Sequence, residues 1–182
     1  MATNDVYLGN PNLKKAGTPI QFTKKQVQEW IKCKKDPIYF ATHYIKIISL
    51  DEGLVPFDMY DFQKRILQDF HENRFNIAKL PRQTGKSTTV VAYLLYYAIF
   101  LDSVNIGILA NKASTARELL GRLQLAYENL PKWMQHGILV WNKGNVELEN
   151  GSKRVAASTS ASAVRGMSFN ILFLDECAFV PN

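Results

Sequence analysis

The sequence predicts an α/β fold in which a mainly parallel sheet is flanked by helices. Apolar stretches of strand length alternate with helix-length segments from residue 75 onward. Hydrophobic residues make up 47% of the 182-residue chain, enough for one sizeable core. Parallel neighbours need a crossover, so this alternation is typical of a parallel sheet. We expect a flexible arm at 1–22, a helical lead-in at 23–74 and the α/β core at 75–182.

The first two regions are predicted from caps and periodicity. Residues 1–21 contain Asn, Gly, Pro and Thr without a period, which favours an arm without regular structure. Thr23 is a favourable N-cap, and Val27, Trp30 and Ile31 follow on one helical stripe. The helices expected in the lead-in cover 24–35, 37–44 and 58–73.

The core is predicted as a series of short strands and two long helices. The strands are expected at 75–80, 104–110, 138–141, 146–148, 154–157 and 170–174. The helices are expected at 87–101, which is largely apolar and therefore buried, and at 113–129. Asn150-Gly151 is a strong signal for a hairpin turn between two of the strands.

The strongest chemical signal is the run LPRQTGKS over residues 80–87. A phosphate-binding loop reads G-x-x-x-x-G-K-[ST], so the Gly-Lys-Ser end fits while Leu80 replaces the first glycine. Gly85 lets the backbone approach a phosphate, Lys86 adds positive charge, and the Ser87 hydroxyl can ligate Mg²⁺. The alternative is a chance Gly-Lys-Ser at a helix start, but the expected strand before it and helix after it favour the loop. The expected ATP-binding residues of this segment are Pro81, Arg82, Gln83, Thr84, Gly85, Lys86, Ser87 and Thr88.

An apolar strand that ends in two acids supplies the partner this loop needs. Asp175 follows the run ILFL and is expected to complete the Mg²⁺ shell, while Glu176 is placed to act as general base on a water. The alternative is a buried strand whose first exposed residues are acidic. The loop and the acidic pair together predict ATP hydrolysis. In NTPases with a catalytic glutamate an extra strand separates these two strands in the sheet.

Gln63 precedes the phosphate loop by about 20 residues and follows Tyr60 and Phe62. An aromatic residue beside a glutamine at this place resembles a motif that reads adenine. Gln63 would hydrogen-bond the base edge and an aromatic ring would stack on it. The competing interpretation is helix packing by the two rings with an exposed glutamine.

Two arginines are candidates for stabilising charge in the transition state. Arg165 lies shortly before Glu176, after a run of small polar residues, and could reach the γ-phosphate of a neighbouring subunit. Arg82, inside the loop, is the rival for this role. A surface salt bridge is the alternative for each.

The bulk composition sets broad limits on function. The net charge of +6 suits a protein that works near phosphate, and the lysine-rich helix at 24–35 could contact DNA or could be an ordinary solvated face. Cys33 and Cys177 have no metal-type spacing, and no apolar run is long enough to span a bilayer. We expect no membrane contact.

The motifs together resemble the large terminase subunits of T-even-type phages. The run RQTGKS at 82–87 resembles the deviant Walker A of that family, which begins with arginine. The run LDECAFVPN at 174–182 resembles its Walker B segment. The segments 36–40, 107–110, 141–144 and 164–166 are also similar to the family, so the resemblance extends from about residue 36 to the end.

This resemblance implies an ASCE-type (RecA-like) P-loop NTPase fold and an ATP-driven motor that packs double-stranded DNA into a prohead. It implies Gln63 for adenine, Arg82 and Lys86 for phosphates, Ser87 and Asp175 for Mg²⁺, Glu176 for catalysis and Arg165 as an arginine finger acting in trans. It further implies a pentameric ring on the portal protein, with a small terminase subunit as partner. The location would be the bacterial host cytoplasm and transiently the prohead, not the mature virion.

Family members are longer and continue beyond the Walker B strand into further ATPase strands and an RNase H-like nuclease domain. This chain ends at Asn182, shortly after Glu176. We therefore expect an incomplete ATPase core, weak or absent turnover and no DNA cleavage. The competing hypotheses are a helicase-like DNA translocase and a non-catalytic nucleotide-binding fragment.

Overall fold

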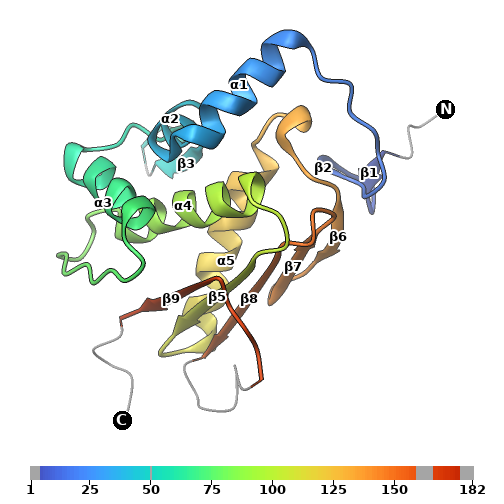
Figure 1. Cartoon of the computed structure of the whole chain (residues 1–182). Helices are drawn as coiled ribbons and strands as arrows, with labels where there is room; N and C mark the ends of the chain where they lie inside the picture. Colours follow the sequence, from blue (N-terminus) through green and yellow to red (C-terminus); the bar gives the residue numbers. More distant parts are fainter. Residues whose placement is uncertain (1–4, 50, 159–165, 177–182) are drawn as a thin grey trace.

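The computed structural model describes residues 5–49, 51–158 and 166–176, and Figure 1 shows their arrangement. In chain order the elements are β1 (Val6–Tyr7), β2 (Asn10–Lys14), α1 (Lys24–Lys35), α2 (Pro37–Tyr44), β3 (Lys46–Ser49), β4 (Gly53–Pro56), α3 (Asp61–Glu72), α4 (Lys86–Phe100), β5 (Asn105–Ala110), α5 (Ala113–Glu128), the 3₁₀ turn η1 (Lys132–Met134), β6 (Ile138–Trp141), β7 (Asn145–Leu148), β8 (Lys153–Ser158) and β9 (Ile171–Asp175).

The main sheet is mixed, with the strand order β6-β7-β8-β5-β9. Strands β8, β5 and β9 run parallel, whereas β6-β7 and β7-β8 are antiparallel pairs. The expectation of a mainly parallel sheet is therefore wrong for half of it. The reason is local: the β6-β7 and β7-β8 connections are too short for a crossover, and Gly151 with φ +80° makes the second turn possible.

Side-chain alternation on the edge strand β9 separates a covered face from an exposed one. Ile106 and Ile108 of β5 are fully buried on the face that packs with the helices, and Phe173 of β9 joins the same core. Leu172 and Leu174 point to the other face and are 48% and 43% exposed. Asp175 follows the pattern of Phe173 and so faces the helix side.

The strand predicted at 75–80 is absent, which is a correction to the sequence analysis. These residues have no strand assignment, and Phe75 and Ile77 are 85% and 96% exposed. A strand needs a hydrogen-bonded neighbour. Strand β9 is an edge strand of the described sheet, and none of the described strands is hydrogen-bonded to residues 75–80.

The helices follow their sequence signals closely. α1 has the expected bounds, and Thr23 and Gln26 form a reciprocal capping box. Asp36 caps α2 by accepting hydrogen bonds from the N–H groups of Ile38 and Tyr39. α4 is buried over most of its length, as its apolar composition predicts. None of the helices in the described ranges is long and apolar enough to cross a membrane.

The N-terminal residues form a hairpin, so the expectation of an arm without regular structure is wrong for residues 6–14. Strands β1 and β2 pair antiparallel, and Leu13 is 1% exposed within the core. The Lys14 backbone N–H donates to the Gln135 side chain at 3.2 Å. Sequence periodicity missed this because the strands are short, and because Gln135, which binds the hairpin, lies more than a hundred residues away.

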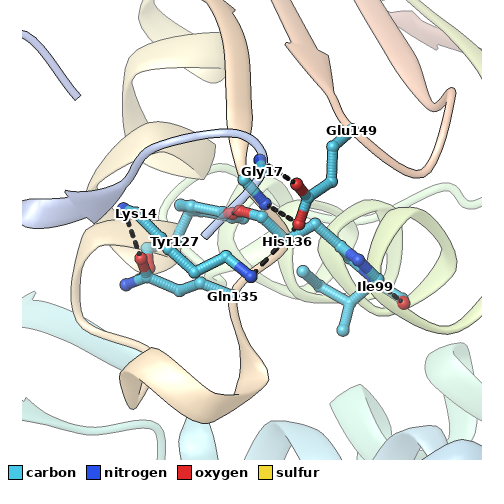
Figure 2. A network of polar contacts seen from close by, with 8 residues as sticks. Lys14, Gly17, Ile99, Tyr127, Gln135, His136 and Glu149 are labelled. Carbon is cyan, nitrogen blue, oxygen red and sulfur yellow. Dashed lines mark hydrogen bonds and ion pairs between the residues drawn. The ribbon is translucent and has the colours of Figure 1, made fainter. Parts of the chain in front are cut away.

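Glu149 is the centre of the polar network that fixes this hairpin (Figure 2). Its carboxylate accepts from Gly17 N at 2.9 Å and Gly137 N at 2.6 Å, and it pairs with Lys14 Nζ at 3.1 Å. Burial acts to raise the pKa of Glu149, but the two N–H groups and the ammonium outweigh it and the pKa is lowered. The ionised carboxylate therefore stabilises the attachment of the N-terminal segment.

His136 and Tyr127 anchor the other side of the network (Figure 2). Burial lowers the pKa of His136, against the opposing effect of its contact with the Ile99 carbonyl at 2.8 Å. The imidazole is therefore neutral at pH 7 and donates from Nε2 to that carbonyl. The Tyr127 hydroxyl donates to the His136 carbonyl. The network thus connects the hairpin to α4 and α5.

We predict that Glu149→Gln lowers the free energy of unfolding by about 1–3 kcal/mol at pH 7, since hydrogen bonds to a charged group are lost. The folded pKa lies below the ordinary value of 4.5, so the contribution is full above that value. It is lost as the pH falls through the folded pKa. Urea unfolding at pH 7 and at pH 3.5 measures this. An equal difference between the two proteins at both pH values would contradict it.

Candidate functional site

The segment before α4 forms a compact turn. Gln83 and Gly85 have φ angles of +62° and +73°, in the left-handed region, and Gly85 is the N-cap of α4. The Thr84 hydroxyl donates to the Pro81 carbonyl at 3.0 Å, and the Thr89 hydroxyl donates to the Gly85 carbonyl at 3.1 Å. The first turn of α4 thus carries Lys86, Ser87 and Thr88, half-buried beside this bend.

Gln63 lies against this loop from α3. It is 3% exposed, and its Nε2 donates to the Thr84 carbonyl at 3.1 Å while its Oε1 accepts from the Tyr60 N–H at 3.0 Å. The interpretation of Gln63 as an exposed residue is therefore wrong. Tyr60 and Phe62 are stacked on each other, with ring centroids 5.8 Å apart, and Tyr60 is 70% exposed.

Lys86 and Asp175 bring the two sequence motifs together. The Lys86 Nζ lies 3.1 Å from Asp175 Oδ1, although the residues belong to α4 and β9. The pair is partly shielded, because the Asp175 side chain is 9% exposed and the Lys86 side chain 32%. The structure thus brings the start of α4 and the acidic end of β9 together at these two residues.

The oxygen atoms present here fit a divalent cation. Asp175 Oδ1 is buried and no described donor hydrogen-bonds to it, since Lys86 approaches within ion-pair distance but outside hydrogen-bond geometry. Carboxylate and hydroxyl oxygens are ligands that Mg²⁺ prefers, usually one or two from the protein together with phosphate and water. Asp175 and Ser87, which follows Lys86 in α4, are the residues that would supply such a pair. The described residues contain no cluster of three or more His, Cys, Asp or Glu side chains.

The structure describes two of the other predicted catalytic groups, Glu176 and Arg82. Glu176 follows β9, is exposed, and has a left-handed φ of +51°, a conformation that non-glycine residues seldom adopt. Arg82 is exposed in the loop, and none of the ion pairs in the described ranges involves it. Arg165 lies outside the described residues, so its role as an arginine finger stays a prediction.

The sequence analysis missed the contact between Gln63 and Thr84. Gln63 is the third residue of α3, where a glutamine often accepts a hydrogen bond from the N-cap residue. Its bond to the Tyr60 N–H could therefore have been predicted. The Thr84 bond could not, because it joins residues on separate elements. A cavity of about 460 Å³ lies elsewhere, beside Trp30, Trp133 and Glu149, and none of the predicted site residues lines it.

Comparison with known proteins identifies a family for most of the core. Residues 77–182 match the family described as "Terminase large subunit, T4likevirus-type, N-terminal". The matched range covers more than half of the chain and includes the phosphate loop and the acidic pair.

Curated relatives are herpesvirus proteins with the name "Tripartite terminase subunit 3". The protein of Human herpesvirus 8 type P (isolate GK18) is 24% identical over 136 residues, which cover 68% of this chain and 18% of the relative. The protein of Equine herpesvirus 2 (strain 86/87) is 21% identical over 131 residues, with the same two coverages. The chain thus spans less than a fifth of the length of these relatives.

A solved structure supports the fold. The crystal structure of the HK97 bacteriophage large terminase matches with a TM-score of 0.63 and 18% identity, over 78% of this chain and 30% of that chain. At this identity the likeness concerns the fold, an α/β domain with a mixed sheet and helices.

We predict that Gly85→Ala lowers the free energy of unfolding by about 1–3 kcal/mol, because alanine is strained at this φ. Its Cβ would also lie 2.5 Å from Gln63 Nε2. Gly121→Ala in α5 is the matched control: its Cβ meets open space, and we expect a gain of about 0.4–1 kcal/mol. Urea unfolding of both variants measures the difference. Wild-type stability for Gly85→Ala would contradict the described loop geometry.

Proposed function

The chain belongs to the T4likevirus-type terminase large subunit family and carries its N-terminal part, and from this premise we propose that it is the ATP-binding and ATP-hydrolysing part of a DNA-packaging motor. In the whole protein, ATP hydrolysis would be coupled to translocation of double-stranded DNA into a prohead. The observation that carries the proposal is the contact between Lys86 and Asp175. It joins a phosphate-binding group to a metal-binding group at one end of the sheet.

Phosphate binding would use the start of α4. The N–H groups of the loop and of the first helical turn have no partner within the helix, and the helix dipole favours an anion there. Lys86 would leave Asp175 and pair with the β- and γ-phosphates. Pro81, Gln83, Thr84 and Thr88 shape the loop around them, and Arg82, exposed beside it, adds positive charge.

Asp175 and Ser87 would hold Mg²⁺, which neutralises charge on the phosphate oxygens when bound. Glu176 would act as general base, taking a proton from the water that attacks the γ-phosphorus while ADP leaves. Its exposed position beyond β9 is compatible with access to water. Arg82 or Arg165 would stabilise the charge of the transferring phosphoryl group, Arg165 from a neighbouring subunit.

The partners follow from family membership and belong to the proposal for the whole protein. They would be double-stranded DNA, the portal protein and a small terminase subunit, with a homo-oligomeric ring, a pentamer, at the portal. The location would be the bacterial host cytoplasm and the prohead during packaging. A nuclease activity would reside in parts of the relatives that this chain does not span.

A second candidate is nucleotide binding with little turnover by these 182 residues alone. The observation that favours it is the state of residues 75–80, which enter the phosphate loop without any strand partner among the described residues. The loop is followed by α4 but is not preceded by a paired strand, so its N–H groups would be less preorganised for phosphate. Preorganised dipoles contribute much of the rate enhancement of enzymes. A helicase-like translocase has no observation in its favour here.

The test is the affinity for Mg-ATP, measured by calorimetry on the wild-type chain and on Lys86→Ala. We expect binding that the substitution weakens by about 10- to 100-fold, because a charge-assisted contact to phosphate is lost. Lys143→Ala is the matched control, since Lys143 is an exposed lysine in the β6-β7 turn, at the other side of the sheet from β9. Equal affinity of wild type and Lys86→Ala, or no binding by the folded chain, would contradict the proposal.

A further inference from the structure

We propose that Gln63 is a positioning residue that orients the Thr84–Gly85 peptide so that the phosphate loop presents an N–H group, rather than a carbonyl, to the nucleotide phosphates. This inference rests on the proposed function and deepens it. It gives Gln63 a role toward phosphate that is separate from the adenine-reading role expected from the sequence.

Both ends of the Gln63 carboxamide are held. Its Oε1 accepts from the Tyr60 N–H at 3.0 Å, which ties it to the start of α3, and its Nε2 donates to the Thr84 carbonyl at 3.1 Å. The side chain is 3% exposed. A buried amide that is hydrogen-bonded at both ends is held in one rotamer, so Gln63 forms a fixed connection between α3 and the loop.

The direction of the Thr84 carbonyl fixes the direction of the next N–H. No cis peptide bond occurs among the described residues, and in a trans peptide the C=O and N–H groups point to opposite sides. Because the Thr84 carbonyl points toward Gln63, the Gly85 N–H points away from α3. The opposite orientation would turn a carbonyl dipole toward an anion and would repel it.

The loop itself leaves this orientation weakly determined. Gln83 and Gly85, on either side of Thr84, are both left-handed, with φ angles of +62° and +73°. Residues at such bends lack the repeating hydrogen bonds that hold a helix or sheet peptide in place. Gln63 also packs directly on Gly85, where a Cβ would come within 2.5 Å of its Nε2. Because Gly85 has no side chain, the Gln63 carboxamide can approach the loop closely.

The proposal predicts which ligands depend on Gln63. If Gln63 orients a phosphate-binding N–H, its substitution must also weaken the binding of a ligand that has no base. If Gln63 contacts only adenine, its substitution must leave the affinity for a ligand without a base unchanged. Inorganic tripolyphosphate with Mg²⁺ is such a ligand, and comparison with Mg-ATP separates the two roles.

The experiment measures the affinity of the chain for Mg-tripolyphosphate and Mg-ATP by calorimetry. For Gln63→Ala we expect both ligands to bind about tenfold more weakly, since one hydrogen bond that sets the loop is lost. Gln63→Met fills nearly the same volume without hydrogen bonds and should behave alike if the alanine variant folds poorly. Gln68→Ala is the matched control, because Gln68 is exposed on the same helix.

An amide spectrum gives a readout that loss of packing alone would not produce. In wild type the ¹H–¹⁵N signal of Gly85 should shift on addition of Mg-tripolyphosphate, and in folded Gln63→Met this shift should be reduced while the fold is retained. Weaker binding of ATP alone, with unchanged tripolyphosphate affinity, would overturn the inference and assign Gln63 to the base. If Lys86→Ala loses tripolyphosphate binding but both Gln63 variants bind normally, the proposed function stands and the inference fails. A wild-type chain that binds neither ligand overturns both.

Discussion

The parallel pairing of β9 with β5 is the constraint on which the candidate site depends. The register places Ala110 opposite Asp175, at the carboxyl end of both strands, and the pleat turns the Asp175 side chain to the helix-covered face. α5 packs on β5 and β8, and α4 packs against α5. The first residue of α4 is Lys86. The 3.1 Å contact between these two side chains is therefore a consequence of sheet register and helix packing.

The candidate site is held together by contacts between α3, α4 and β9. The Lys86 ammonium lies 3.1 Å from the Asp175 carboxylate. The loop before Lys86 is fixed from α3 through Gln63, so the helix that precedes the loop in sequence also shapes it. Nucleotide binding would thus act on three elements at once, α3, α4 and β9, in a fold of the large terminase type.

Local signals in the sequence predicted much of this structure, and non-local pairing accounts for what they missed. Thr23 and Asp36 mark helix starts, and Gly85-Lys86-Ser87 marks the start of α4, because caps and loops are encoded by neighbouring residues. The β1-β2 hairpin is held by the distant residues Gln135 and Glu149, and segment 75–80 has no hydrogen-bonded strand among the described residues. Arg154 is another case. Burial lowers the pKa of this fully buried guanidinium to about 10, and no hydrogen-bond partner for it lies among the described residues, which the pattern of β8 did not predict.

The central claim is that Asp175 and the phosphate loop form one Mg-nucleotide site, and the most direct measurement is the ATP affinity of wild type and Asp175→Asn with Mg²⁺ and with EDTA. The account predicts that Mg²⁺ strengthens ATP binding by wild type and has little effect on Asp175→Asn. Without Mg²⁺ the variant should bind ATP at least as tightly as wild type, because Lys86 then has no competing carboxylate. An undiminished effect of Mg²⁺ in Asp175→Asn would contradict the account.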